Sequence, residues 1–270
     1  FIKMNRRDFL KKFTQLTVLG AFPFLYSWQI EPFWVEFVYK KMPIKNLPEE
    51  LEGKTLIQIS DLHVGNRFDW KFLIDSFRKA QKLKPDFVVY TGDFVQYGNQ
   101  SERKDLETVL QNAVLGKLGT VGILGNHDYG KNWSEPDVAD EIVKIAENSG
   151  IKMLLDEEFE VFGLNFIGFE DLWSNRFQPE KAMQYFSSEK ANLVLCHNPD
   201  ACDLDIWNGY QGWILSGHTH GGQCRIPGVV TPFLPVKNRK YISGKIDLED
   251  GRTLYINRAI GHSYQVRFMV

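Results

Sequence analysis

Two histidines one residue apart, His218 and His220, follow an apolar run at residues 213–215. Side chains at positions i and i+2 of an extended chain point to the same side, so these imidazoles can chelate metal when carboxylates arrive from elsewhere in the chain. A His-x-His pair alone is also typical of a polar loop at a strand end. The rest of the chain must decide between the two interpretations.

Four other apolar runs are also followed closely by Asp, Asn or His. They lie at residues 56–60, 86–90, 120–124 and 192–196. The segments that follow them are Asp61-Leu62-His63, Thr91-Gly92-Asp93, Gly125-Asn126-His127-Asp128 and His197-Asn198. Every histidine except His262 lies at such a strand end, which is not expected of histidines that fill a core or cover a surface. The pattern predicts one site assembled from several strand ends.

Helical patterns alternate with these strands, at residues 70–83, 101–115 and 135–148, and each is followed by Pro or Gly. The order strand, polar segment, helix and strand is typical of βαβ units, in which the loops at the carboxyl ends of the strands hold the site. Alternating units of this kind, followed by hairpins, predict an α/β fold of two packed mixed sheets with helices outside.

The pattern changes to strands after residue 151. Gly163 and the segment 249–251 are turn signals between short apolar runs. The predicted strands are residues 159–162 with 164–169, residues 245–248 with 253–257, and residues 266–270.

Composition limits the class of protein. A chain of 270 residues that is 43% hydrophobic can form one large domain with a sizeable core. The net charge of −2 provides no general basic field, and motifs that read nucleic acid are not found, so we expect no nucleic-acid partner. The sequence indicates no protein partner either.

The cysteines are few and odd in number: Cys196, Cys202 and Cys224. Such a set fits a reducing compartment better than a secreted fold held by disulfides. Cys196 ends a predicted buried strand, where a free cysteine commonly acts as a small hydrophobic residue, so we interpret it as core and not as a metal ligand.

The N-terminus differs from the rest of the chain. Basic residues precede an aromatic-rich apolar stretch at residues 13–38, and residues 13–30 carry no charge. This length approaches a membrane span but contains polar residues, so we predict a membrane-associating helical element with basic residues at the headgroups. A helix docked on the domain is the alternative. The predicted division is residues 1–42 for this segment, 43–53 for a linker and 54–270 for the catalytic domain.

The segment Asn5-Arg6-Arg7-Asp8-Phe9-Leu10-Lys11 resembles the twin-arginine export signal. No small-x-small cleavage site follows the apolar stretch. Together with the cysteine usage, this favours association with the cytoplasmic face of an inner membrane. Export through the twin-arginine signal is the alternative.

The polar segments resemble, in order, the motif blocks of the calcineurin-like metallophosphoesterases. The blocks are Asp61-x-His63, Gly92-Asp93, Gly125-Asn126-His127-Asp128, His197 and Gly217-His218-x-His220. The resemblance covers residues 56 to about 222 and implies a four-layer αββα sandwich that hydrolyses phosphoric esters with two metal ions. A non-catalytic scaffold of this fold is expected to lack ligands, and here none is missing.

The same resemblance implies the role of each site residue. Asp61, His63, Asp93 and His220 are expected to bind one metal, and Asp93, Asn126, His197 and His218 the second. This mixed donor set suits manganese, iron or zinc, and the resemblance favours Mn²⁺. His127 is expected to donate a hydrogen bond or proton near the leaving-group oxygen, and Asp128 either to orient His127 or to cap the loop.

The later segments 220–227, 239–241 and 254–263 are similar to the YkuE-like branch of this family, and within it to the LpxG-type UDP-2,3-diacylglucosamine pyrophosphatases of lipid A synthesis. This implies a lipid-linked nucleotide-sugar substrate at a membrane surface, split to UMP and 2,3-diacylglucosamine 1-phosphate. An exported YkuE-like envelope phosphoesterase with a different substrate is the alternative.

Substrate contacts are predicted on less specific grounds. Arg67, Arg225 and Arg239 are candidates to neutralise the second phosphate, because guanidinium groups pair well with phosphate. The apolar loop 227–235 is a candidate to contact acyl chains, and packing of this loop on its own domain is the alternative.

Overall fold

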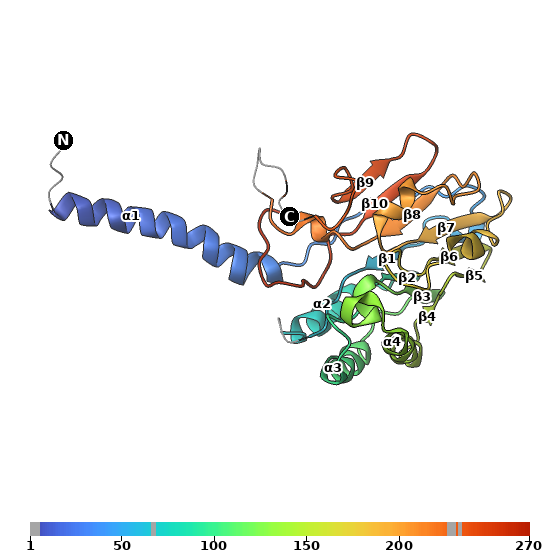
Figure 1. The fold of residues 1–270 in the computed structure, drawn as a ribbon. Helices are drawn as coiled ribbons and strands as arrows, with labels where there is room; N and C mark the ends of the chain where they lie inside the picture. The colour runs from blue at the N-terminus through green and yellow to red at the C-terminus, as the bar shows by residue number, and fades with distance from the viewer. Residues whose placement is uncertain (1–5, 66–68, 226–230, 232–233) are drawn as a thin grey trace.

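The computed structural model describes residues 6–65, 69–225, 231 and 234–270 (Figure 1). Two β-sheets pack against each other, and three helices cover the outer face of the first sheet. The predicted fold class, an α/β sandwich of two sheets with helices outside, is confirmed.

The first sheet has the strand order β1-β2-β3-β4, and its pairs are all parallel. Its strands are β1 (Leu56–Ile59), β2 (Phe87–Thr91), β3 (Gly119–Ile123) and β4 (Lys152–Met153), and the helices between them are α2 (Lys71–Gln81), α3 (Gln100–Leu110) and α4 (Pro136–Asn148). The three predicted helices are confirmed, although α3 ends five residues before the predicted position 115. Asn99 fixes its start, because the Asn99 side chain accepts from the Glu102 amide.

The second sheet has the order β5-β6-β7-β8-β10-β9 and is mixed. Its strands are β5 (Glu157–Val161), β6 (Leu164–Gly168), β7 (Ala191–Leu195), β8 (Trp213–Ser216), β9 (Gly244–Asp247) and β10 (Thr253–Ile256), with the short helix α5 (Pro179–Met183) between β6 and β7. Both predicted hairpins are confirmed, because β5 with β6 and β9 with β10 pair antiparallel.

The predicted last strand at residues 266–270 is wrong. This segment forms one isolated bridge, between Phe268 and Cys224. Its backbone amides are used elsewhere: Arg267 donates to the Ser27 carbonyl, and Met269 and Val270 donate to the Glu31 carboxylate. The C-terminal segment therefore binds the N-terminal region instead of a sheet.

Three apolar clusters show how the layers hold together. On β2, Phe87 and Val89 face the second sheet, whereas Val88 and Tyr90 face the helices, as the alternation of a strand requires. A third cluster lies on the outer face of the second sheet, under α5 and the turn at Pro199–Asp203. The remaining short helical turns are Tyr26–Ile30, Glu31–Phe33, Glu49–Leu51, Asn126–Tyr129, Lys131–Trp133 and His220–Gly222.

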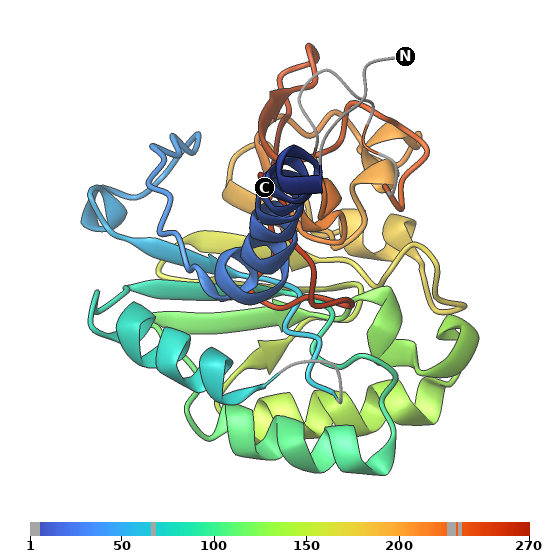
Figure 2. The same ribbon diagram turned by 90° about the vertical axis from the view of Figure 1, so that its left-hand side faces the viewer.

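Helix α1 (Arg6–Leu25) projects away from the sandwich, with the C-terminal segment beside its base (Figures 1 and 2). Within the described residues, none of the helices combines the length and the apolar character needed to cross a bilayer. Residues 34–47, here called the strap, then run without regular structure to the outer edges of the two sheets. The division of the chain at residues 42 and 53 stays a prediction.

Candidate metal centre

The strand ends bring the predicted ligands together in two adjacent groups. Potential ligand atoms within 4.8 Å of one another come from Asp61, His63, Asp93 and His220 in one group, and from Asp93, His197 and His218 in the other. All of these residues are buried, and Asp93 belongs to both groups. Asn126 begins the turn after β3, and its buried Oδ1 has no hydrogen-bond partner among the described residues.

The backbone turns sharply where these side chains leave the strands. Asp61, His63, Asp93, His218 and His220 have φ angles between 47° and 70°, the left-handed region. Asp and His tolerate this conformation better than most residues, yet each such position still costs about 1 kcal/mol or more. Hydrogen bonds across the loops offset this cost. Asp61 N–H donates to the Gly92 carbonyl, and Asp61 accepts from the His218 amide at 2.9 Å.

Two glycines make room for this convergence. A Cβ atom on Gly125 would lie 2.3 Å from Asp93 Oδ1, and one on Gly217 would lie 2.0 Å from Ser60 Oγ. Because neither position can hold a side chain without moving a site residue, the motif glycines before Asn126 and His218 are required by packing.

In the first group, nitrogen and oxygen atoms face one another at short range. The Nε2 atoms of His63 and His220 lie 2.9 Å apart, and His220 Nε2 is 3.4 Å from Asp61 Oδ1. Burial lowers the pKa of His63 to about 3 and that of His220 well below its usual value, so both rings are neutral. Neutral imidazoles with converging lone pairs are metal ligands.

In the second group, backbone carbonyls fix the tautomers. His197 Nδ1 lies 2.6 Å from the Thr91 carbonyl, and His218 Nε2 lies 2.9 Å from the Pro235 carbonyl. A carbonyl oxygen can only accept, so each of these nitrogens carries a proton. Burial lowers the pKa of His218 to about 3, so its other ring nitrogen keeps a lone pair. Burial would also lower the pKa of His197, but the pairing with Asp93 raises it well above its usual value. Although burial opposes it, the pairing with His197 holds the pKa of Asp93 well below its usual range, so the shared carboxylate is an anion.

The donor set fits two divalent cations. It combines a carboxylate shared by both groups, imidazoles, and an amide oxygen that has no hydrogen-bond partner in the described part of the chain. The roles of the individual ligands remain predictions, but the structure places every predicted ligand in or beside this cluster.

His127 lies at the edge of the cluster. Its ring packs edge-on against His63, with 4.8 Å between the ring centroids. Its Nδ1 lies 2.7 Å from the Gln96 carbonyl, and its backbone amide donates to Asp93 Oδ1. The ring is therefore oriented by the main chain at Gln96, which leaves Nε2 to exchange a proton.

The hydrogen bonds of Asp128 within the described residues are to backbone amides and not to the His127 ring, which the orienting role would require. Its carboxylate accepts from the backbone amides of Phe94, Val95 and Gly125, at 2.8, 3.2 and 2.8 Å. These bonds tie the loop after β2 to the loop after β3. The geometry agrees with the alternative, a loop cap beside the site.

The substrate-binding role of the three arginines stays a prediction. The Arg239 guanidinium donates to the Thr231 and Leu234 carbonyls, and the Arg225 side chain is exposed. Arg67 and most of the loop 227–235 lie outside the described residues. Leu234 of that loop packs on the outer core of the second sheet, as the alternative of a self-packed loop requires.

Several neighbours of the site were not predicted. Trp173 packs edge-on against the His218 ring at 4.6 Å, and Asn198 Nδ2 is 3.4 Å from His218 Nε2. Arg258 forms an ion pair with Glu36 at 2.5 Å and lies against Gly221, the residue after His220. Asn198 and Arg258 stood within the motif segments, but only the fold shows what they touch.

Comparison with known proteins gives consistent results. The family model described as "Calcineurin-like phosphoesterase" matches residues 54–222. The chain is 27% identical to the phosphodiesterase YaeI of Escherichia coli, over 98% of this chain and 95% of that protein. It is 24% identical to the UDP-2,3-diacylglucosamine pyrophosphatase LpxG of Chlamydia muridarum, over 96% and 94%. It is 25% identical to the uncharacterized metallophosphoesterase YkuE of Bacillus subtilis, over 96% and 91%.

Proposed function

Since the chain belongs to the calcineurin-like phosphoesterases, we propose that it hydrolyses the pyrophosphate of UDP-2,3-diacylglucosamine to UMP and 2,3-diacylglucosamine 1-phosphate. The general activity, metal-dependent hydrolysis of a phosphodiester or pyrophosphate, follows from the family and from the buried cluster of Asp and His side chains. The observation that carries it is the position of Asp93 in both ligand groups.

The proposed ligands would hold two divalent ions, which we take to be Mn²⁺, with iron and zinc also suited to the donors. When bound, such a pair lowers the pKa of a water, clamps phosphoryl oxygens and stabilises the charge that develops during displacement. His127, oriented through Nδ1 by the Gln96 carbonyl, delivers a proton from Nε2 to the leaving sugar phosphate. The Asp128 cap keeps the loops that carry Asp93 and His127 in place.

A substrate held in a membrane is supported by the N-terminal region. The side chains of Arg6, Arg7 and Lys11 are exposed near the start of α1, and Phe24 and Trp28 are exposed at its base. A helix that projects alone into water is only marginally stable, whereas a lipid surface can bury its apolar residues and bind its basic ones. We propose that α1 holds the enzyme on the cytoplasmic face of the inner membrane, where an acylated substrate is concentrated.

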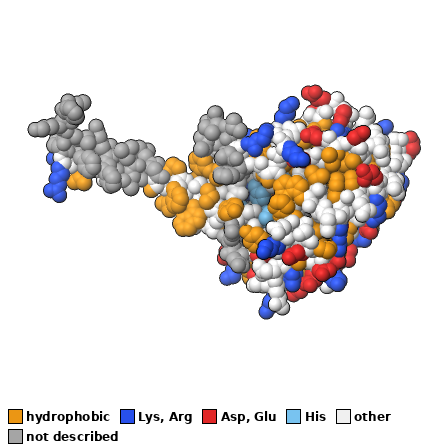
Figure 3. All heavy atoms as spheres, in the orientation of Figure 1, with side chains coloured by type: hydrophobic (Ala, Val, Ile, Leu, Met, Phe, Trp, Pro, Cys, Tyr) orange, Lys and Arg blue, Asp and Glu red, His pale blue; other side chains and the backbone are white. Residues whose placement is uncertain are grey.

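The site and this apolar surface are neighbours. Figure 3 shows hydrophobic side chains around the base of α1 and over the adjoining face of the body, with histidine side chains between them. This arrangement supports a substrate whose phosphates are hydrolysed beside the bilayer. The likeness to LpxG supports the particular head group.

The second candidate is an exported envelope phosphodiesterase or phosphoesterase with a different substrate. The likeness to YaeI favours it, as does the exposure of Arg6 and Arg7 in a segment that resembles an export signal. The same centre would serve both reactions, so the substrate distinguishes the candidates.

The deciding experiment is product analysis with Mn²⁺ present. UDP-2,3-diacylglucosamine, UDP-N-acetylglucosamine and bis(p-nitrophenyl) phosphate are compared, with Asp93→Ala as the blank. We expect UMP and the diacyl sugar phosphate, formed far faster than products of the unacylated nucleotide sugar. Turnover of the small diester without turnover of the lipid would retain the phosphoesterase activity and reject the proposed substrate.

A further inference from the structure

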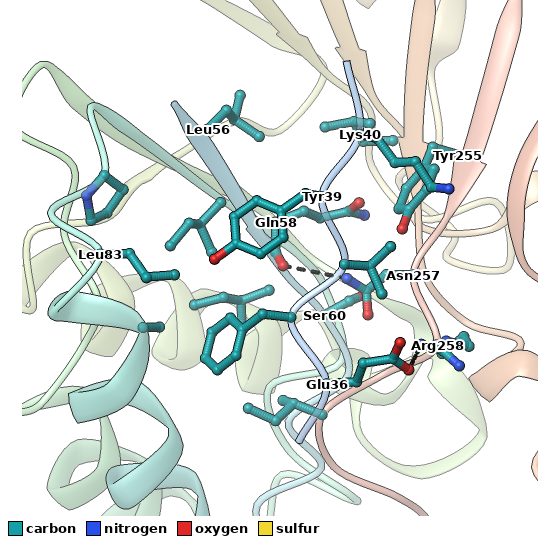
Figure 4. A pocket seen from close by; sticks show the side chains of 18 of the residues that line it. Glu36, Tyr39, Lys40, Leu56, Gln58, Ser60, Leu83, Tyr255, Asn257 and Arg258 are labelled. Carbon is teal, nitrogen blue, oxygen red and sulfur yellow. Dashed lines mark hydrogen bonds and ion pairs between the residues drawn. The ribbon is translucent and has the colours of Figure 1, made fainter. Parts of the chain in front are cut away.

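A cavity of about 1080 Å³ lies outside the metal centre, between the strap and the edges of the two sheets (Figure 4). We call it the chamber. Leu56 of β1, Leu83 after α2, Tyr39 of the strap and Tyr255 of β10 line it, and hydrophobic side chains predominate in its walls. Its volume is slightly above the range of about 300–1,000 Å³ that is usual for small-molecule sites, so it has room for a flexible ligand.

The strap spans the chamber without closing the sheet edge. β1 is the outer strand of its sheet, and within the described residues it pairs on one side only, with β2. No backbone-to-backbone hydrogen bond joins the described residues 35–46 to either sheet. The strap is held near its ends. Glu36 pairs with Arg258 at one end. At the other, the Pro43 carbonyl accepts from Trp213 Nε1 at 2.9 Å and Asn46 Nδ2 donates to the Ser188 carbonyl at 2.9 Å.

One end of the chamber is lined by residues that adjoin the ligands of the metal centre. Ser60 lines the chamber, and its hydroxyl donates to Asp61 Oδ2 at 2.5 Å. Arg258 also lines it and lies against Gly221, which follows His220. A ligand whose polar group lies at the metal centre therefore has an apolar volume within reach.

The strap also connects the chamber with the apolar surface at α1. Trp34 and Tyr39 are exposed although both line the chamber, and Tyr26, next to the base of α1, lines it as well. The chamber therefore borders the apolar surface at α1, the side from which a hydrocarbon chain would enter it.

We propose that the chamber binds one unbranched aliphatic chain of a membrane lipid, while the phosphate of that lipid lies at the metal centre. If the proposed function holds, this lipid is the acylated substrate. Binding of the aliphatic chain can be measured without hydrolysis of that substrate. Each methylene taken from water into the chamber strengthens binding about fourfold, so affinity should rise with chain length until the chamber is full.

The probe for this proposal is cis-parinaric acid, a fluorescent fatty acid, titrated into the full chain below its micelle concentration. We expect saturable binding to the wild type. Leu83→Trp and Leu56→Trp, which fill the chamber from two sides, should weaken binding at least about tenfold, because they displace several methylenes. Leu83 is 45% exposed and is the variant less disturbing to the core.

Leu204→Trp is the matched control, because Leu204 is 40% exposed and lies outside the chamber. It should bind the probe as the wild type does, and it shares α1 with the other variants, so any loss is assigned to the chamber and not to the helix. Hydrolysis of bis(p-nitrophenyl) phosphate should be unchanged in Leu83→Trp and Leu204→Trp, which establishes that both are folded.

Absence of saturable binding, or equal binding by the wild type and Leu83→Trp, would overturn the proposal. A chamber that instead receives a peptide strand at the open edge of β1 gives that result. Failure of the proposed substrate is a separate outcome: probe binding that is lost in Leu83→Trp, without hydrolysis of UDP-2,3-diacylglucosamine, keeps the chamber and rejects the head group. Hydrolysis of that lipid at equal rates by wild type and Leu83→Trp keeps the function and rejects the chamber.

Discussion

The residues around Asp93 and the residues of the strap lie within one chain, but they are held in different ways. At the metal centre, the loops after β1, β2, β3 and β8 are joined by short hydrogen bonds, several of them to Asp61 and Asp128. In the strap, residues 35–46 make no backbone-to-backbone hydrogen bond to either sheet. The strap is attached by the Glu36–Arg258 ion pair and by hydrogen bonds from the Trp213 indole to Pro43 and from Asn46 to Ser188.

The difference matches what each region has to do. Hydrolysis needs ligands fixed in geometry before substrate arrives, since positioning supplies much of the rate. Entry of a long apolar chain needs a wall that can move at little cost, and segments with few hydrogen bonds open most easily. We therefore expect substitutions at the centre to have large effects and substitutions in the strap to have small ones.

The largest effect is expected for Asp93→Ala. Both ligand groups lose their shared carboxylate, so hydrolysis of bis(p-nitrophenyl) phosphate should fall at least about 1000-fold. Metal analysis of the purified protein should show loss of both ions. The exposed Asp75→Ala on α2 is the control and should keep metal and activity. Retention of either ion by Asp93→Ala would show that the two groups are independent.

His127→Ala should reduce kcat about 100-fold and leave the metal content unchanged, because His127 supplies a proton and holds no metal in the proposed arrangement. The loss should be smaller for a substrate with a more acidic leaving group, which needs less protonation. Comparison of two aryl phosphodiesters measures this. A variant that is fully loaded with metal and has the wild-type kcat would refute the role.

Asp128→Ala should lower the free energy of unfolding by about 3 kcal/mol, because it leaves three buried backbone donors without an acceptor. Urea unfolding measures the change. Asp128→Asn retains an oxygen for Phe94 and Val95 and should lose less. If either variant kept its stability and lost kcat as His127→Ala does, Asp128 would act on His127 and not as a loop cap.

These three sites show how far sequence could predict the molecule. The ligand segments could be placed because Asp and His stand at strand ends, and parallel strands bring such ends to one edge. The helices could be placed because their apolar periodicity is strong. The function of Asp128 could not be decided, because its partners Phe94 and Val95 are more than thirty residues away in the chain.

The contacts of the strap, in contrast, could not be predicted from the sequence. The sequence predicted a linker at residues 43–53 and an apolar segment before it, but it carried no sign that Pro43 accepts from Trp213 or that Glu36 pairs with Arg258. The strand predicted at 266–270 failed for the same reason, since its amides bind Ser27 and Glu31. Pairings between distant segments depend on the assembled fold and leave no local pattern.

A smaller effect, on membrane binding, is expected for substitutions at the base of α1. The double variant Phe24→Ser and Trp28→Ser should weaken binding to vesicles with anionic lipids about tenfold, because two aromatic side chains no longer enter the interface. Sedimentation with the vesicles measures this. Phe162→Ser is the control, since Phe162 at the β5–β6 turn is 61% exposed, as is Phe24. Equal losses in both proteins would mean that α1 is not the lipid-binding element.

The smallest effect is expected for Glu36→Gln. This change breaks the ion pair with Arg258 at one end of the strap, but the Glu36 side chain is 61% exposed, so the free energy of unfolding should change by less than about 1 kcal/mol. Limited proteolysis within residues 35–42 should nevertheless become faster, because one polar attachment of the strap is gone. Amide hydrogen exchange in β2, which leads to Asp93, should not change. A loss of stability as large as that of Asp128→Ala would mean that the strap is part of the rigid core, and the contrast between a fixed centre and a movable wall would be wrong.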